Sequence, residues 1–175
     1  SAAMIKLARK KAPAAKFKIG SLFDARLPAC NAMTSIGEVI SYLFDRNIKK
    51  DSLFKLFRNV YQALEAGGVF IFDVMESLPY ELKYPKRVYK EGKDWAILFS
   101  ATCDRKKKTL TRHIVTYRKV GAHYKRSEEV HHLKVLNRKI VRGELERAGF
   151  RVRYLQSYGK LQMMPGRLGF LAQKN

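Results

Sequence analysis

The sequence predicts an α/β domain built on a parallel β-sheet, and two observations in its first half carry this prediction. Residues 51–64 place apolar side chains at three- and four-residue spacings, which is the period of an amphipathic helix. Gly67-Gly68 then ends the helical pattern, and the apolar run 69–74 follows. A strand that is apolar on both faces is typical of a parallel sheet covered by helices. The predicted helix face consists of Leu53, Phe57, Val60, Tyr61 and Leu64.

The segments on either side extend this pattern. Before residue 51 we expect a helix over 2–11, a short strand around 17–19, a strand over 32–36 and a short helix or loop over 40–45. After residue 74 the pattern becomes antiparallel, because short polar segments separate three strand-like runs. These runs cover residues 95–99, 110–118 and 123–136, and they are followed by an Asn137-capped helix that Gly149 ends and by strands over 151–158 and 166–172.

Composition limits the class of protein. The chain has 175 residues, enough for one domain with a sizeable core. Its 36 Lys and Arg against 15 Asp and Glu give a net charge of +21, which makes nucleic acid or an anionic membrane surface a candidate partner. A scattered, solvated basic surface is the alternative interpretation. Cys30 and Cys103 lack metal-site spacing, and no apolar run reaches membrane-spanning length, so we expect a cytoplasmic protein.

The expected parallel sheet indicates where a ligand would bind. In open α/β sheets, ligands lie beyond the carboxyl ends of the parallel strands. Residues 20–22, 36–38 and 73–75 follow three predicted strands. A glycine at position 37 would let a ligand approach the backbone closely. The alternative is that Gly20 and Gly37 are ordinary turn residues at strand ends.

Two stretches of sequence resemble a known family. L-E-A-G-G-V-F-I-F-D-V (64–74) and M-T-S-I-G-E-V (33–39) resemble segments around the fifth and fourth strands of class I S-adenosylmethionine (SAM) dependent methyltransferases. The resemblance extends over nearly the whole chain, through L-T-R-H-I, Y-K-R-S-E-E-V-H-H-L and E-L-E-R-A-G-F-R-V. It implies a partial Rossmann-like methyltransferase sheet with an antiparallel β insertion after the fifth strand. The implied organisation is one domain over 1–175, in which residues 94–136 form a lid or substrate platform.

The resemblance also implies a cofactor, SAM, and an unidentified methyl acceptor. It makes Gly20, Ser21 and Leu22 candidate adenine contacts, and it makes Ile36 and Gly37 candidate contacts of the donor beside the reaction centre. Methyl transfer needs mainly alignment of donor and nucleophile, and a general base helps only when the acceptor carries a proton. Glu38 and His132 are the candidates for that base, and the sequence does not choose between them. Tyr42, Glu128 and Tyr158 are candidate substrate contacts.

The segment 124–132 contains a second group of polar residues. On a strand, Arg126, Glu128, Val130 and His132 share one face, opposite Glu129 and His131. A Glu-x-His pair can bind a metal or relay protons. Because no third ligand is in view, we expect no metal and interpret the pattern as salt bridges to nearby Lys and Arg.

One part of the family pattern is not found. The family's glycine-rich loop and the acidic residue that holds the donor ribose have no counterpart here, and Ser1 to Met4 resembles the segment just after them. In the family's sheet order, 3-2-1-4-5-7-6, the first and second strands carry that loop and that acidic residue and lie in the central part of the sheet. We therefore expect a fragment of a longer enzyme that is inactive alone. If the chain is instead complete, its SAM binding should be weak or absent. The alternatives are a non-catalytic basic module that binds nucleic acid or a partner subunit, and a homo-oligomer that completes the sheet.

Overall fold

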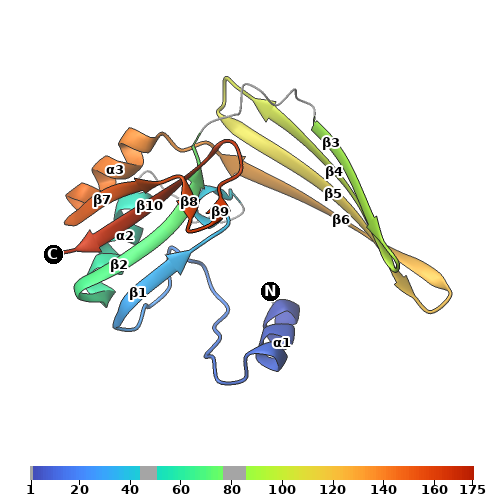
Figure 1. Cartoon of the computed structure of the whole chain (residues 1–175), viewed down its shortest axis with the longest axis horizontal. Coiled ribbons are helices and arrows are strands. Elements are labelled where there is room, and N and C mark those ends of the chain that lie inside the picture. Colours follow the sequence, from blue (N-terminus) through green and yellow to red (C-terminus); the bar gives the residue numbers. More distant parts are fainter. Residues whose placement is uncertain (1, 44–50, 77–85) are drawn as a thin grey trace.

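The structure is a computed structural model that describes residues 2–43, 51–76 and 86–175 (Figure 1). An α/β core contains a four-stranded sheet and a short two-stranded sheet, and a second four-stranded sheet is inserted into it. The elements before the insertion are α1 (Ala2–Lys11), β1 (Cys30–Ser35), the 3₁₀ helix η1 (Val39–Ser41), α2 (Ser52–Ala63) and β2 (Leu64–Met75). The inserted strands are β3 (Lys86–Gly92), β4 (Trp95–Asp104), β5 (Thr109–Val120) and β6 (His123–Lys134). The core is completed by α3 (Arg138–Arg147), β7 (Phe150–Leu155), the short strands β8 (Ser157–Tyr158) and β9 (Leu161–Gln162), and β10 (Arg167–Lys174).

The core sheet has the strand order β1-β2-β10-β7. β1 runs parallel to β2, whereas β10 is antiparallel to both β2 and β7. Helices α2 and α3 lie together against one face of this sheet (Figure 1). Phe57 of α2 contacts the stacked rings of Phe70 and Phe72, and Phe72 in turn stacks on Phe170 with ring centroids 5.0 Å apart. The predicted α/β class is therefore confirmed.

The boundary between α2 and β2 differs from the prediction. The helix ends at Ala63 rather than at the glycines, and Leu64 is already extended. Lys174 donates to the carbonyl oxygens of Tyr61 and Leu64 at 2.8 and 2.6 Å, so a distant cation satisfies this end of the helix. Gly67 and Gly68 instead lie inside β2, where the pairing with β1 shifts register between Cys30 and Ala32. The sequence pattern could not distinguish a helix end from a strand irregularity, because both favour glycine.

The inserted strands form an antiparallel sheet in the order β3-β4-β5-β6, which confirms the predicted meander. β3 is an additional strand that the sequence pattern did not predict. This sheet extends away from the core (Figure 1). It joins the core through a second apolar cluster in which Met75 contacts Ala101, Leu110 and Leu133. Two backbone hydrogen bonds, Leu136 N to Met75 O and Leu43 N to His132 O, are both 2.8 Å long.

Two strand predictions near the chain ends differ from the structure. The strand predicted over 151–158 is divided into β7 and β8, which belong to different sheets. The predicted strand at 17–19 is irregular chain, since a strand needs a ladder partner and no described strand lies beside it. The helices predicted at 2–11 and after Asn137 are confirmed, and the Asn137 side chain accepts from Lys139 N at 2.9 Å. The predicted segment 40–45 begins as η1, and its remainder beyond residue 43 lies outside the described residues. Across the described ranges, no helix is both long and apolar enough to cross a membrane.

Candidate functional site

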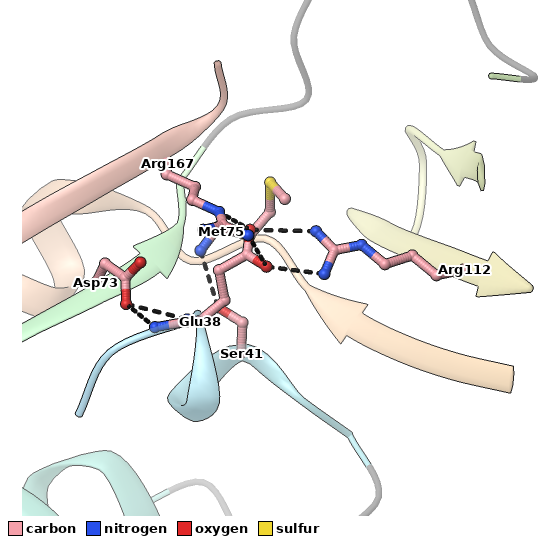
Figure 2. Close-up of polar contacts among 7 residues, drawn as sticks. Glu38, Ser41, Asp73, Met75, Arg112 and Arg167 are labelled. Atoms are coloured by element: carbon pink, nitrogen blue, oxygen red, sulfur yellow. Dashed lines mark hydrogen bonds and ion pairs between the residues drawn. The ribbon is translucent and has the colours of Figure 1, made fainter. Parts of the chain in front are cut away.

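A tight turn at the carboxyl end of β1 forms the centre of the candidate site. Gly37 and Glu38 both have left-handed backbone conformations, with φ of 96° and 60°. The buried carboxylate of Asp73, near the end of β2, accepts hydrogen bonds from Gly37 N at 2.7 Å and Glu38 N at 3.0 Å (Figure 2). A left-handed conformation is unfavourable for glutamate by about 1–2 kcal/mol. The two charge-assisted hydrogen bonds to Asp73 offset that cost and fix the turn against the neighbouring strand.

The Glu38 side chain is completely buried and lies between two arginines (Figure 2). Arg112 of β5 approaches Glu38 Oε2 at 2.8 Å through Nη1 and Oε1 at 3.2 Å through Nη2. Arg167, at the start of β10, approaches Oε1 at 2.9 Å through Nε and Oε2 at 3.2 Å through Nη2. Both carboxylate oxygens therefore have two partners each. One buried carboxylate connects the β1 turn, the inserted sheet and the carboxyl-terminal strand.

The pKa of Arg112 reflects its pairing with Glu38. Burial by itself lowers the pKa of its guanidinium, but hydrogen bonds and the negative charge of Glu38 outweigh burial, so its pKa lies above the ordinary value. Nearby, the Ser41 hydroxyl accepts from Met75 N at 3.0 Å and ties η1 to the end of β2. The site is thus a buried, ion-paired junction at the carboxyl edge of the parallel strand pair.

The structure brings four of the predicted site residues together. Ile36 is half exposed beside Gly37, and a Cβ added at Gly37 would meet nothing within 4 Å. Glu38 is buried beneath them. Tyr42 packs edge-on against the His131 ring, with centroids 5.5 Å apart. The strand end therefore presents an open surface over a buried ion cluster. The roles assigned to these residues stay predictions.

Residues 20–22 lie in the loop that precedes β1. Ser21 Oγ accepts from Phe23 N at 3.0 Å, and Leu22 packs against the main core. Gly20 is exposed, and a Cβ there would meet nothing within 4 Å. The proposed contact of this loop with adenine remains a prediction.

The structure places Glu128 and His132 on a different face from the arginine cluster. Strand alternation puts both residues on the face of β6 opposite His131, whose pairing partner on β5 is Arg112. His132 Nδ1 lies 3.1 Å from Thr111 Oγ1. Glu128 lies 2.5 Å from His113 Nε2 and 2.6 Å from Arg126 Nη2, and these hydrogen bonds lower its pKa. His132 and Glu38 are therefore not neighbours on one face, and the catalytic role of His132 stays a prediction.

The predicted salt bridges to Lys and Arg are present in part. Glu128 is paired with Arg126, whereas Glu129 lies 3.1 Å from a histidine, His131. In the part of the chain that the structure describes, no group of three or more His, Cys, Asp or Glu could hold a metal ion. Sequence reasoning missed Arg112 and Arg167 as site residues. No local signal could have found them, since they lie 74 and 129 residues from their shared partner.

Tyr158 has an unusual hydroxyl group. Its oxygen is buried, and within the described residues it has no hydrogen-bond partner. Burial and then the negative charge of Asp73 raise its pKa to about 12, against the opposing effect of Arg167. The hydroxyl is thus a neutral donor close to the strand-end carboxylate, and its predicted contact with substrate remains untested.

This pKa gives a prediction for stability at high pH. An ordinary tyrosine ionises near pH 10, so between about pH 10 and 12 the unfolded chain loses this proton while the folded chain keeps it. The contribution of Tyr158 to the free energy of unfolding is fully present below pH 10 and is lost as pH rises through that range. We expect the free energy of unfolding of Tyr158→Phe, measured by urea denaturation, to fall less between about pH 10 and 12 than that of the wild type. Tyr124→Phe replaces an exposed tyrosine, so its free energy of unfolding should depend on pH as that of the wild type does. The same dependence on pH in all three proteins would contradict the prediction.

Comparison with known proteins defines the class of fold. No protein-family model and no curated protein matches the chain. Among solved structures, the chain is similar to an S-adenosylmethionine-dependent methyltransferase from Clostridium acetobutylicum ATCC 824, with a TM-score of 0.80 and 18% identity, covering 100% of this chain and 72% of that one. It is also similar to Streptomyces venezuelae DesVI, with a TM-score of 0.78, 20% identity and the same coverage. The sugar N-methyltransferase KedS8 from Streptoalloteichus sp ATCC 53650 gives a TM-score of 0.76 and 18% identity, covering 100% and 68%.

These similarities establish the fold. The chain has the fold of class I SAM-dependent methyltransferases, as its sequence suggested. The observed order β1-β2-β10-β7 corresponds to strands 4-5-7-6 in the family's sheet order.

Proposed function

We propose that this protein takes part in SAM-dependent methyl transfer to the amine of a small sugar-like acceptor. The observation that carries the proposal is the β1 turn, in which Asp73 fixes the amides of Gly37 and Glu38 at the carboxyl edge of parallel strands. This edge is where α/β sheets bind ligands. The fold supports the reaction class, although a fold by itself does not determine a function.

The residues at this edge fit the sulfonium end of the donor. Gly37 has no side chain and faces open space, so a ligand can approach its backbone. Ile36 is half exposed beside it and offers an apolar contact. These two residues would hold that end of SAM, which supplies an electrophilic methyl group when bound. Residues 20–22 remain the candidates for the adenine contact.

We assign Glu38 a positioning role in this proposal. Both of its oxygens are in ion pairs with Arg112 and Arg167, and the side chain has no exposed surface. A carboxylate held this way stabilises the turn and is poorly placed to take a proton from an acceptor. A neutral amine needs no base before it attacks a methyl group, so alignment and exclusion of water are the main tasks left to the protein. Tyr42 and the inserted sheet would form the wall for the acceptor.

The acceptor class comes from the similar structures. KedS8 is described as a sugar N-methyltransferase. A further similar structure, CalS10, is described as an amino pentose methyltransferase. It has a TM-score of 0.73 and 16% identity, covering 100% of this chain and 71% of that chain. An amino sugar is therefore the acceptor that we propose. A cytoplasmic location stays a prediction.

Donor binding tests this proposal directly. We expect saturable but weak binding of S-adenosylhomocysteine, near a millimolar dissociation constant or about −4 kcal/mol, in saturation-transfer NMR. Ile36→Ala should weaken binding about tenfold, because it removes apolar contact. Ile140→Ala is the matched control, since Ile140 is an exposed isoleucine on α3, and it should bind like wild type. Absence of saturable binding, or equal losses in both variants, would contradict the proposal.

A further inference from the structure

The far end of the inserted sheet carries a flat, partly exposed aromatic ring. Trp95 is the only tryptophan in the chain, and it pairs with Gly92 across β3 and β4. A Cβ added at Gly92 would lie 2.5 Å from Trp95 Nε1 and 2.7 Å from Cε2, so the indole occupies the space above this glycine. Trp95 is nevertheless 42% exposed. One side of the ring therefore rests on the sheet while part of it remains open to solvent.

Cations flank this ring on the same face. The pairing register places Arg118 of β5 directly opposite Trp95, and Lys125 of β6 directly opposite Arg118. Lys90 is two residues from Gly92 and so also shares the face. All three cations are exposed, and within the described residues none forms an ion pair. We call Lys90, Trp95, Arg118 and Lys125 the Trp95 face.

The carboxylates of the sheet do not neutralise the Trp95 face. Glu91 and Glu128 lie on the opposite face by strand alternation, and Glu128 is paired with Arg126 and His113. Glu129 shares the face but lies farther from the end of the sheet, 3.1 Å from His131. Among the described residues, no carboxylate forms an ion pair with Lys90, Arg118 or Lys125, and the acidic residue nearest to Trp95 along the chain is Asp94, in the turn just before it.

We propose that the Trp95 face binds single-stranded nucleic acid. An exposed aromatic ring on a β-sheet can stack with a base of any identity, and adjacent Lys and Arg can contact the backbone phosphates. The net charge of +21 would attract such a strand over longer distances. A duplex would not fit this surface in the same way, because its bases are already stacked inside the helix. This proposal stands independently of the methyltransferase function.

The lone tryptophan makes the proposal directly measurable. Titration of the whole chain with a short single-stranded oligouridylate should quench Trp95 fluorescence in a saturable, salt-sensitive manner. Anisotropy of a labelled oligonucleotide would give affinities for all variants. We expect Trp95→Ala to weaken binding by about 5- to 150-fold, the usual effect of losing one stacking ring. Trp95→Phe should bind within about threefold of wild type, because it keeps an aromatic face, and it controls for distortion of the strand end.

Charge variants separate the Trp95 face from the overall charge. The double variant Arg118→Gln/Lys125→Gln should make the slope of log affinity against log salt shallower by about 1.4, or about 0.7 for each lost phosphate contact. Lys106→Gln/Lys139→Gln removes the same charge from exposed positions elsewhere and should change the slope much less. Equal effects of the two double variants would overturn the proposal. Unchanged Trp95 fluorescence, equal affinity for a duplex, or displacement of the strand by polyglutamate of matched charge would also overturn it.

Discussion

Replacing Glu38 with glutamine should lower the free energy of unfolding by about 3–5 kcal/mol, the usual cost of removing one partner from a buried ion pair. Glutamine has nearly the same shape, so the loss would come from charge rather than from a cavity. Arg112 and Arg167 would keep their positive charges in a partly buried setting without the carboxylate that now neutralises them. Urea denaturation followed by circular dichroism measures the difference.

Glu146→Gln is the matched control for this prediction. The Glu146 carboxylate lies 2.7 Å from Arg142 Nε, but both side chains are exposed on α3. Exposed pairs of this kind contribute about 0.3–0.5 kcal/mol. Similar effects of Glu38→Gln and Glu146→Gln would show that the buried cluster contributes no more than a surface salt bridge.

Glu38→Gln should also loosen the inserted sheet relative to the core. Arg112 belongs to β5, so the ion pair links the inserted sheet to the core, together with the backbone bonds of Leu43 and Leu136. We expect faster amide hydrogen exchange around Arg112 and in the adjoining segment of β6, with little change in β7. Uniform acceleration across the whole chain would indicate global destabilisation instead of a local loss of contact.

Gly68→Ala is the second substitution with a large expected effect. A Cβ at this position would lie 2.8 Å from the carbonyl oxygen of Glu65 and 3.0 Å from that of Asn31, both of which are backbone atoms. The strands would have to shift where β1 and β2 change register. Overpacking of this kind is unfavourable by about 1–3 kcal/mol. We expect destabilisation near the upper end of that range, because backbone cannot move aside as a side chain can.

Gly143→Ala provides a control of opposite sign. Gly143 lies inside α3, and a Cβ there would meet nothing within 4 Å. Alanine in a helix interior is favoured over glycine by about 0.5–1 kcal/mol, so this variant should be more stable than wild type. Denaturant midpoints of the two variants should therefore move in opposite directions. A stable Gly68→Ala protein would contradict the close packing described around β2.

Local patterns predicted those elements whose formation depends on neighbouring residues. The three- and four-residue spacing on α2, the Asn137 cap of α3 and the apolar run of β2 all act within a few residues, and all three elements are present. Predictions became wrong where a partner far away in sequence decides the conformation. The segment at 17–19 has strand-like residues but no ladder partner, and α2 ends at Ala63 with its last carbonyls bonded to Lys174.

Sequence patterns correctly predicted the fold class, the antiparallel insertion and the strand-end position of Ile36, Gly37 and Glu38. These predictions follow from hydrophobic periodicity and turn residues, which involve only residues close together in the sequence. The three-dimensional arrangement of the strands was needed to show that Glu38 is a buried partner of Arg112 and Arg167, and that His132 faces away from the arginine cluster. Glu38 is separated in the sequence from Arg112 by 74 positions and from Arg167 by 129 positions. Such contacts depend on the order of the strands and on which face of each strand points inward. That order is set by packing of the whole chain, so no local pattern in the sequence records it.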